Sequence, residues 1–105
     1  LYGCVVLLKG SRTLISDSSG KIYLNMTGNP GLSSGGSGDT LTGIVAGMLA
    51  QNLEALPAAA AAAFLHGLAG DLVARKNQGA TGIIATDLIS HIPRAIAKCQ
   101  QPDCN

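Results

Sequence analysis

The sequence predicts an α/β protein from three observations. An apolar run at residues 3–8 is typical of a strand that is buried on both faces of a sheet. A hairpin pattern follows it, and apolar residues at helical spacing fill most of the remaining chain. Apolar residues make up 47% of the 105, with one Phe, two Tyr and no Trp, so Ala, Val, Leu and Ile must form the core. We expect helices lying on a mostly parallel sheet with a small β-hairpin.

In the first half of the chain, turn and loop residues separate the predicted strands and the first helix. Residues 13–16 and 21–25 form two short β-like segments joined by a turn at residues 17–20, which predicts the hairpin. A glycine-dense loop at residues 27–38 follows and runs directly into a helix. That helix is amphipathic, because its apolar residues recur on one face: Leu41, Ile44, Val45, Met48 and Leu49.

The second half is predicted to be helical. After a connector at residues 51–56, Pro57 begins a helix that is apolar nearly all round and is therefore expected inside the domain. Residues 78–82 form a loop, Thr86 caps a short helix through His91, and Pro93 begins a last helix through Cys99. Residues 101–105 are expected to fray, and no internal repeat or second domain is visible.

Composition excludes several classes of function. A net charge of +1 with 12% charged residues leaves no basic face for nucleic acid and no polybasic membrane anchor. The longest apolar run, residues 57–65, is too short to cross a bilayer, and no signal peptide opens the chain. A small-molecule ligand and a cytoplasmic location are therefore expected.

The three cysteines and two histidines give no metal-site spacing. Cys4 is predicted to be a small core residue within the first strand. Cys99 and Cys104 could pair with each other, but we expect thiols in a reducing compartment. His66 and Asp71 stand five positions apart, about 140° around a helix, so they do not share a face. We expect buried, hydrogen-bonded structural roles for both, and close backbone packing at Gly67 and Gly70.

The junction between the glycine-dense loop and the first helix is a candidate anion site. The first turn of a helix presents unpaired N–H groups and the positive end of the helix dipole, and neighbouring glycines let them approach phosphate oxygens. Asp39 stands there to meet a hydroxyl or a metal ion. The alternative is an ordinary helix entry with Ser37 or Asp39 as the cap. Residues 31–35 match the nucleophile-elbow pattern of serine hydrolases, but that motif needs its serine on a strand-to-helix turn, and here five more loop residues precede the helix. The P-loop and dinucleotide-binding patterns do not match the sequence.

A second candidate site is the segment that follows the first strand. A Lys, an Arg and two hydroxyls lie at the carboxyl end of that strand, where open α/β sheets bind ligands: Lys9, Gly10, Ser11, Arg12 and Thr13. The alternative is a polar turn without function.

The motifs closely resemble those of the NAD(P)H-hydrate dehydratases, nucleotide-dependent repair enzymes of the ribokinase-like superfamily. The resemblance runs from about Val5 to Pro93 and is carried by three stretches: VVLLKGSRTLI, GNPGLSSGGSGDTLTGIVAGMLAQ and AAFLHGLAGDLVA. It implies that residues 1–105 are the C-terminal part of a single ribokinase-like domain. The family's members are more than twice as long, so the N-terminal part of the domain is expected to be absent from this chain.

The resemblance also implies site residues and a reaction. The KGxxT segment of the family contacts the adenine nucleotide, which assigns nucleotide binding to Lys9, Gly10, Ser11, Arg12 and Thr13. Gly38 is expected to contact nucleotide phosphate and Asp39 the substrate, with Asn29, Gly35 and Gly36 in the same phosphate loop. Hydrated NADH or NADPH would be phosphorylated by ADP or ATP, aided by Mg²⁺, and would then lose phosphate. Asp39 is the expected base, and the family suggests a homo-oligomer.

Two other functions remain open at this point. A sugar or vitamin-precursor kinase of the same superfamily would use the same glycine-rich loop and aspartate but leave a stable phosphorylated product. A non-catalytic fragment would keep part of a nucleotide site and associate through an exposed core face.

Overall fold

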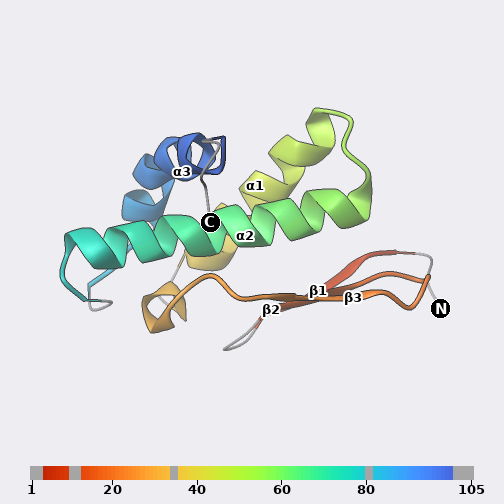
Figure 1. Cartoon of the computed structure of the whole chain (residues 1–105), viewed down its shortest axis with the longest axis horizontal. Helices are drawn as coiled ribbons and strands as arrows, with labels where there is room; N and C mark the ends of the chain where they lie inside the picture. The colour runs from red at the N-terminus through yellow and green to blue at the C-terminus, as the bar shows by residue number, and fades with distance from the viewer. Residues whose placement is uncertain (1–3, 10–12, 34–35, 80–81, 101–105) are drawn as a thin grey trace.

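The computed structural model describes residues 4–9, 13–33, 36–79 and 82–100. It shows a small sheet beneath a layer of three helices, with α2 lying lengthwise over the strands (Figure 1). The strands are β1 (Val6–Leu8), β2 (Thr13–Ser16) and β3 (Ile22–Asn25), and a short 3₁₀ helix, η1 (Pro30–Ser33), follows them. The helices are α1 (Ser37–Ala50), α2 (Ala55–Lys76) and α3 (Ala85–Cys99). The predicted α/β class is confirmed.

The sheet of the described residues is an antiparallel meander in the order β1-β2-β3. Ile15 lies opposite Leu7 on one side and Tyr23 on the other, and Leu14 pairs with Leu24. This confirms the hairpin and corrects the expectation of mostly parallel pairing for these strands. Four residues separate β1 from β2, whereas parallel neighbours need a crossover of roughly a dozen or more, so only antiparallel pairing can join them.

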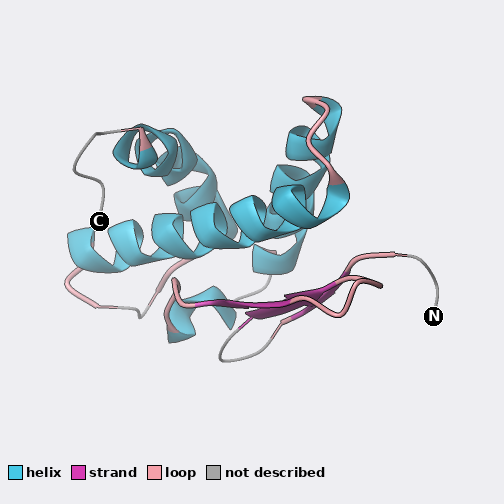
Figure 2. Ribbon diagram, turned by 45° about the vertical axis from the view of Figure 1, so that its right-hand side comes forward, coloured by secondary structure: helices cyan, strands magenta, loops and turns pink. Residues whose placement is uncertain are grey.

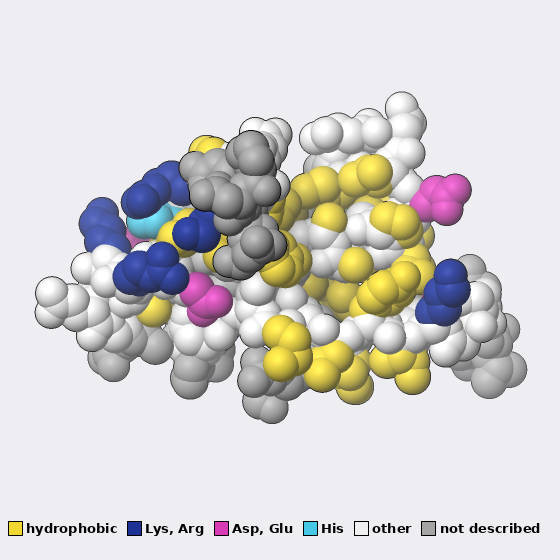
Figure 3. All heavy atoms as spheres, in the orientation of Figure 1, with side chains coloured by type: hydrophobic (Ala, Val, Ile, Leu, Met, Phe, Trp, Pro, Cys, Tyr) yellow, Lys and Arg dark blue, Asp and Glu magenta, His cyan; other side chains and the backbone are white. Residues whose placement is uncertain are grey.

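Only one face of this sheet is covered. Ile15 is buried against α2, where it packs with Ala59 and Ala63, and all three helices lie on that side (Figure 2). β1 is therefore not buried on both faces as predicted: Val6 is 54% and Leu8 63% exposed. Hydrophobic side chains consequently lie open along the strand layer below α2 (Figure 3). We call this exposed set the apolar sheet face: Val6, Leu8, Leu14, Ile22, Leu24 and Met26.

The central element is α2, which contacts the sheet, η1 and both other helices. Eleven of its 22 residues are buried, which confirms the prediction of a helix inside the domain. It begins at Ala55, two residues earlier than predicted, and Pro57 occupies its first turn, where the missing N–H costs no helical hydrogen bond. By length and mean hydropathy α2 could cross a membrane, but 61% of its apolar window is buried in this fold.

One face of α2, which we call the small stripe, carries small residues that let another segment of the chain approach the helix backbone closely. Ala59, Ala63, Gly67 and Asp71 recur every four residues and so share a face. The Ala63 carbonyl accepts a hydrogen bond from Asn25 Nδ2 at 3.1 Å. The hydroxyl oxygen of Thr27 lies 3.0 Å from the Phe64 carbonyl oxygen. The small stripe therefore lets the chain leaving β3 lie directly on the helix backbone.

The C-terminal helix differs from the prediction. A single helix, α3, runs through Pro93, and Thr86 lies inside it instead of capping it. The helix begins after Ile84, whose N–H donates to the Asp87 carboxylate at 3.2 Å. It continues past the proline because Leu88, His91 and Ala95 form one buried stripe on both sides of it, while the Pro93 side chain is exposed. Packing of that stripe outweighs the lost backbone hydrogen bond.

The cysteines give one further correction. Cys4 is exposed and does not belong to the core. It lies before β1, where the chain bends and sheet pairing has not yet begun. Cys99 is exposed at the end of α3, while Cys104 and residues 101–105 lie outside the described residues.

Substitution of Gly67 tests the close approach of Thr27 to α2. An added Cβ would lie 2.6 Å from the Thr27 carbonyl carbon, which is backbone and cannot swing away. Gly67→Ala is therefore expected to lower the free energy of unfolding by about 2 kcal/mol or more. Gly47→Ala is the matched control, since nothing lies within 4 Å of its added Cβ. It should raise stability by roughly 0.5–1 kcal/mol. Urea denaturation measures both, and equal effects would contradict the close approach.

Candidate functional site

The candidate site is organised by the start of α1. Gly36 precedes the helix with φ +87°, a left-handed conformation that side chains rarely adopt. A Cβ added there would also lie 3.1 Å from the Ala85 Cβ of α3. Glycine is therefore required at this position by both the backbone conformation and the neighbouring helix.

Among the described residues no side chain caps the first turn of α1, and the residue that precedes it is Gly36. Ser37 is the first residue of the helix and is buried, and Asp39 is the third and is exposed. Neither residue caps the helix, which removes the ordinary helix entry weighed as an alternative. The first-turn N–H groups and the positive end of the helix dipole are the features that a bound anion needs.

Lys9 brings the second predicted segment to the same place. It follows β1, and its Nζ lies 3.6 Å from the position that a Cβ on Gly38 would take. The two segments are 29 residues apart in sequence, yet they place an ammonium group against the first turn of α1. Thr13 begins β2 and is half-buried. Because β1 pairs with β2, Thr13 and Lys9 stand at the two ends of the connection between these strands. The predicted residues between them, Gly10, Ser11 and Arg12, lie outside the described residues, as does Gly35.

Asp71 holds the loop that leads toward the site. The Gly28 N–H donates to its Oδ2 at 3.0 Å, and Asn29 Nδ2 donates to its Oδ1 at 3.0 Å. The Oδ1 of Asn29 accepts the Gly31 N–H at 2.9 Å. Asn29 was predicted to help hold phosphate, and its side chain is here engaged in shaping the loop. Contact between Asn29 and phosphate remains a prediction.

His66 lies on another side of α2 and meets α1. Its Nε2 is 3.0 Å from the Ser37 carbonyl oxygen and 3.1 Å from the Ser37 hydroxyl oxygen. Burial lowers the pKa of His66, the Ser37 carbonyl raises it in part, and the nearby Lys9 ammonium lowers it further. Both residues are hydrogen-bonded as predicted, although Asp71 is only half-buried, and the two face different partners.

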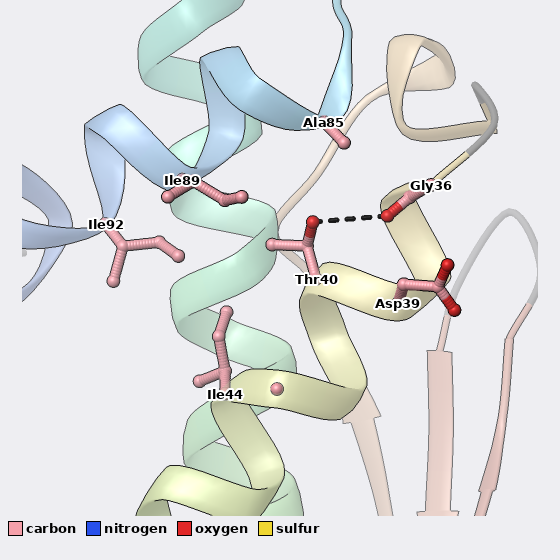
Figure 4. Close-up of a pocket in the computed structure, with 8 residues that line it drawn as sticks. Gly36, Asp39, Thr40, Ile44, Ala85, Ile89 and Ile92 are labelled. Atoms are coloured by element: carbon pink, nitrogen blue, oxygen red, sulfur yellow. Dashed lines mark hydrogen bonds between the residues drawn. The ribbon is translucent and has the colours of Figure 1, made fainter.

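An open pocket of about 540 Å³ lies between α1 and α3. Gly36 and Thr40 form its polar end, Asp39 borders it there, and its apolar end includes Ile44 and isoleucines of α3 (Figure 4). The Thr40 hydroxyl donates to the Gly36 carbonyl at 3.2 Å, which leaves its methyl group toward the apolar end. Asp39 points to the opposite side of the first turn, toward the strands (Figure 4). The start of α1 thus has an apolar side and a carboxylate side.

Sequence reasoning missed the α3 part of this pocket. Ala85, Ile89 and Ile92 line it, although 40 or more residues separate them from the glycine-dense loop. No sequence signal marks them, because the 56% exposure of Ile89, off the buried stripe of α3, is a property of the folded chain. An exposed isoleucine beside a helix start is compatible with a binding surface, but the sequence alone does not place the two together.

This chain is similar in sequence to known proteins. A family model described as NAD(P)H-hydrate dehydratase matches residues 1–94. The bifunctional NAD(P)H-hydrate repair enzyme Nnr of Moorella thermoacetica is 46% identical over 100 residues, covering 95% of this chain and 19% of the relative. The ADP-dependent (S)-NAD(P)H-hydrate dehydratase of Neisseria meningitidis is 41% identical over 88 residues, covering 84% of this chain and 30% of the relative.

A solved structure shows the same fold. The ADP/ATP-dependent NAD(P)H-hydrate dehydratase of Bacillus subtilis, co-crystallised with ATP and Mg²⁺, aligns with a TM-score of 0.81 and 37% identity. The alignment covers 90% of this chain and 34% of that structure. This chain therefore spans about a third or less of the proteins that it matches.

An exchange of partners tests the role of Asp71. In Asp71→Asn one amide nitrogen would face that of Asn29, so the loop should loosen and stability should fall by about 1–2 kcal/mol. The double variant Asn29→Asp with Asp71→Asn restores a donor opposite an acceptor and keeps an acceptor for the Gly28 and Gly31 N–H groups. It should recover most of the loss. Urea denaturation and amide exchange at Gly28 measure both variants. A double variant that is less stable than Asp71→Asn would refute the hydrogen bond between Asn29 and Asp71 as the cause.

Proposed function

Because the chain belongs to the NAD(P)H-hydrate dehydratase family, we propose that it supplies the nucleotide-phosphate side of a site that dehydrates hydrated NADH and NADPH. ADP or ATP is the phosphoryl donor. The observation that carries this proposal is the uncapped glycine start of α1 with the Lys9 ammonium beside Gly38. Backbone N–H groups, a helix dipole and one cation at a single place are suited to nucleotide phosphates.

The first-turn amides of α1, Lys9 and Asp39 each have a chemical role in the proposed reaction. The amides of the first α1 turn and Lys9 hold the phosphates and offset their negative charge. Asp39 is exposed on the strand side of this turn and accepts the proton of the substrate hydroxyl. The hydroxyl oxygen attacks the terminal phosphorus of the nucleotide. The donor nucleotide leaves one phosphate shorter. The carbon–oxygen bond then breaks with its electron pair leaving on phosphate, and a ring proton passes to water as its C–H electrons restore the double bond. Positioning and charge neutralisation supply most of the catalysis.

The residues present fit a magnesium ion that is held mainly by substrate. Magnesium in phosphoryl-transfer sites uses one or two carboxylates together with phosphate oxygens. Among the residues that the structure describes, no three acidic, His or Cys side chains gather as a metal site, and Asp39 is the acidic residue of the pocket lining. Asp39 would be the protein carboxylate nearest the ion. When bound, the ion would reduce the negative charge on the phosphates.

We also propose that this chain is the C-terminal part of a single nucleotide-dependent domain. Two observations support it: the chain aligns with 34% of the Bacillus subtilis structure, and the apolar sheet face is exposed. An exposed face lined by apolar side chains is typical of a surface that becomes buried against protein, so the remaining part of the domain is the proposed cover. A cytoplasmic location follows from the soluble cofactors that are the proposed substrates, and a homo-oligomer is proposed from the family.

Recovery of reduced-nicotinamide absorbance tests the proposed reaction. The chain is mixed with hydrated NADH, Mg²⁺ and either ADP or ATP, both alone and with the preceding two-thirds of a related domain added. Recovery is expected in the completed domain, with the effective nucleotide naming the donor. A stable phosphorylated product, seen by mass spectrometry, would indicate the kinase alternative. Nucleotide binding without turnover in either sample would indicate a non-catalytic fragment.

Asp39→Asn separates binding from chemistry. The amide keeps the size of the side chain but cannot accept the hydroxyl proton, so kcat should fall about 10²- to 10⁴-fold. The dissociation constant for the nucleotide should change little, because the phosphates are held by amides and Lys9. Calorimetric titration and the absorbance assay measure the two quantities on the same preparation. Retained turnover would remove Asp39 from the role of base.

A further inference from the structure

The contact between His66 and Ser37 carries a role beyond filling the core. His66 is 5% and Ser37 1% exposed, so their polar atoms must satisfy one another inside the protein. The Nε2 of His66 lies 3.0 Å from the Ser37 carbonyl oxygen. A carbonyl oxygen can only accept, so Nε2 carries the hydrogen and donates it. The Ser37 hydroxyl oxygen, 3.1 Å from the same nitrogen, then acts as a second acceptor.

The protonation state of His66 agrees with this arrangement. Burial is the main cause of its lowered pKa, and the Lys9 ammonium acts in the same direction. The ring is therefore neutral near pH 7, with its single hydrogen on Nε2. A neutral donor adds no further positive charge to the place where Lys9 already lies.

Planarity of the peptide bond extends this contact to the phosphate site. The Ser37 carbonyl and the Gly38 N–H belong to one trans peptide unit, so they point in opposite directions in one plane. Fixing the carbonyl toward α2 fixes the Gly38 N–H away from it, toward the open start of α1. The first turn of α1 already sets the direction of this peptide unit. Helix ends fray, and glycines flank Ser37 on both sides, so the His66 hydrogen bond adds a restraint where the backbone is most free.

We propose that His66 is a positioning residue that orients the Gly38 N–H for phosphate through its hydrogen bond to the Ser37 carbonyl. The inference rests on the proposed nucleotide site and adds to it a residue of α2 that does not touch the ligand. It differs from a purely structural role, because it ties His66 to the direction of one amide and to anion affinity.

Three variants separate positioning from stability. His66→Leu removes the donor. His66→Gln keeps an N–H donor at a similar distance from the backbone. His91→Leu is the matched control, since His91 is also buried, at 8% exposed. Unlike His66, His91 contacts its own helix: its Nδ1 meets the Asp87 carbonyl of α3.

Anion affinity is measured by calorimetric titration of the full chain with inorganic pyrophosphate and with ADP. His66→Leu should weaken both about tenfold, the effect of one lost hydrogen bond. His66→Gln should stay within about threefold of the unmodified chain, and His91→Leu should bind normally even if it is less stable. Equal weakening by His66→Leu and His91→Leu, or no weakening by His66→Leu, would overturn the proposal.

Orientation of the amide gives a readout that needs no ligand. The residual dipolar coupling of the Gly38 N–H should change in His66→Leu and be recovered in His66→Gln, while couplings in α2 remain. An unchanged Gly38 coupling would overturn the positioning role. If neither the unmodified chain nor the completed domain binds pyrophosphate or ADP, the proposed function fails, and the Gly38 coupling still decides whether His66 orients that amide.

Discussion

The close approach between the small stripe of α2 and the chain leaving β3 is the constraint on which the rest of the structure depends. At Ala63 and Gly67 the helix offers almost no side chain, so Asn25 and Thr27 reach the helix backbone. Such contacts require a backbone separation that a larger side chain would prevent. The sheet is thereby fixed on one face of α2, and the following loop begins at a defined point.

From that point the polar groups of α2 determine where α1 starts. Asp71 binds two groups of the loop, and His66 binds Ser37 at the first turn of α1. One helix therefore fixes the loop from one side and the helix start from another. No side chain of the described residues caps these first-turn amides, and the Lys9 ammonium lies beside them, so positive potential is concentrated at the start of α1. Neutral His66 supports this arrangement without adding charge.

The two surfaces of the chain serve different purposes. The pocket between α1 and α3 is open and bounded by residues of both helices, with a polar end at Gly36 and an apolar end at the isoleucines. The apolar sheet face is instead defined by exposed apolar side chains of all three strands. Its exposed Ile22, at 71%, belongs with surfaces that become buried against protein. This division agrees with a chain that forms part of a larger nucleotide-dependent domain.

The sequence by itself determined the local features of this protein. Spacing of apolar residues identified α1 and α2, turn residues identified the β2-β3 hairpin, and glycine density marked the start of α1, because each depends on neighbours within a few residues. The family motifs indicated the likeness that the comparisons show, whereas the predicted nucleotide and substrate contacts remain predictions.

Tertiary structure decided what depends on packing between distant segments. Pro93 predicts a break when only its own backbone is considered, but the buried stripe of α3 itself keeps that helix continuous. The exposure of β1, the contact of Lys9 with the first turn of α1, and the isoleucines of α3 in the pocket follow from how whole elements pack. No local pattern encodes these distances, because they are set by the small stripe of α2 and by the three helices sharing one face of the sheet.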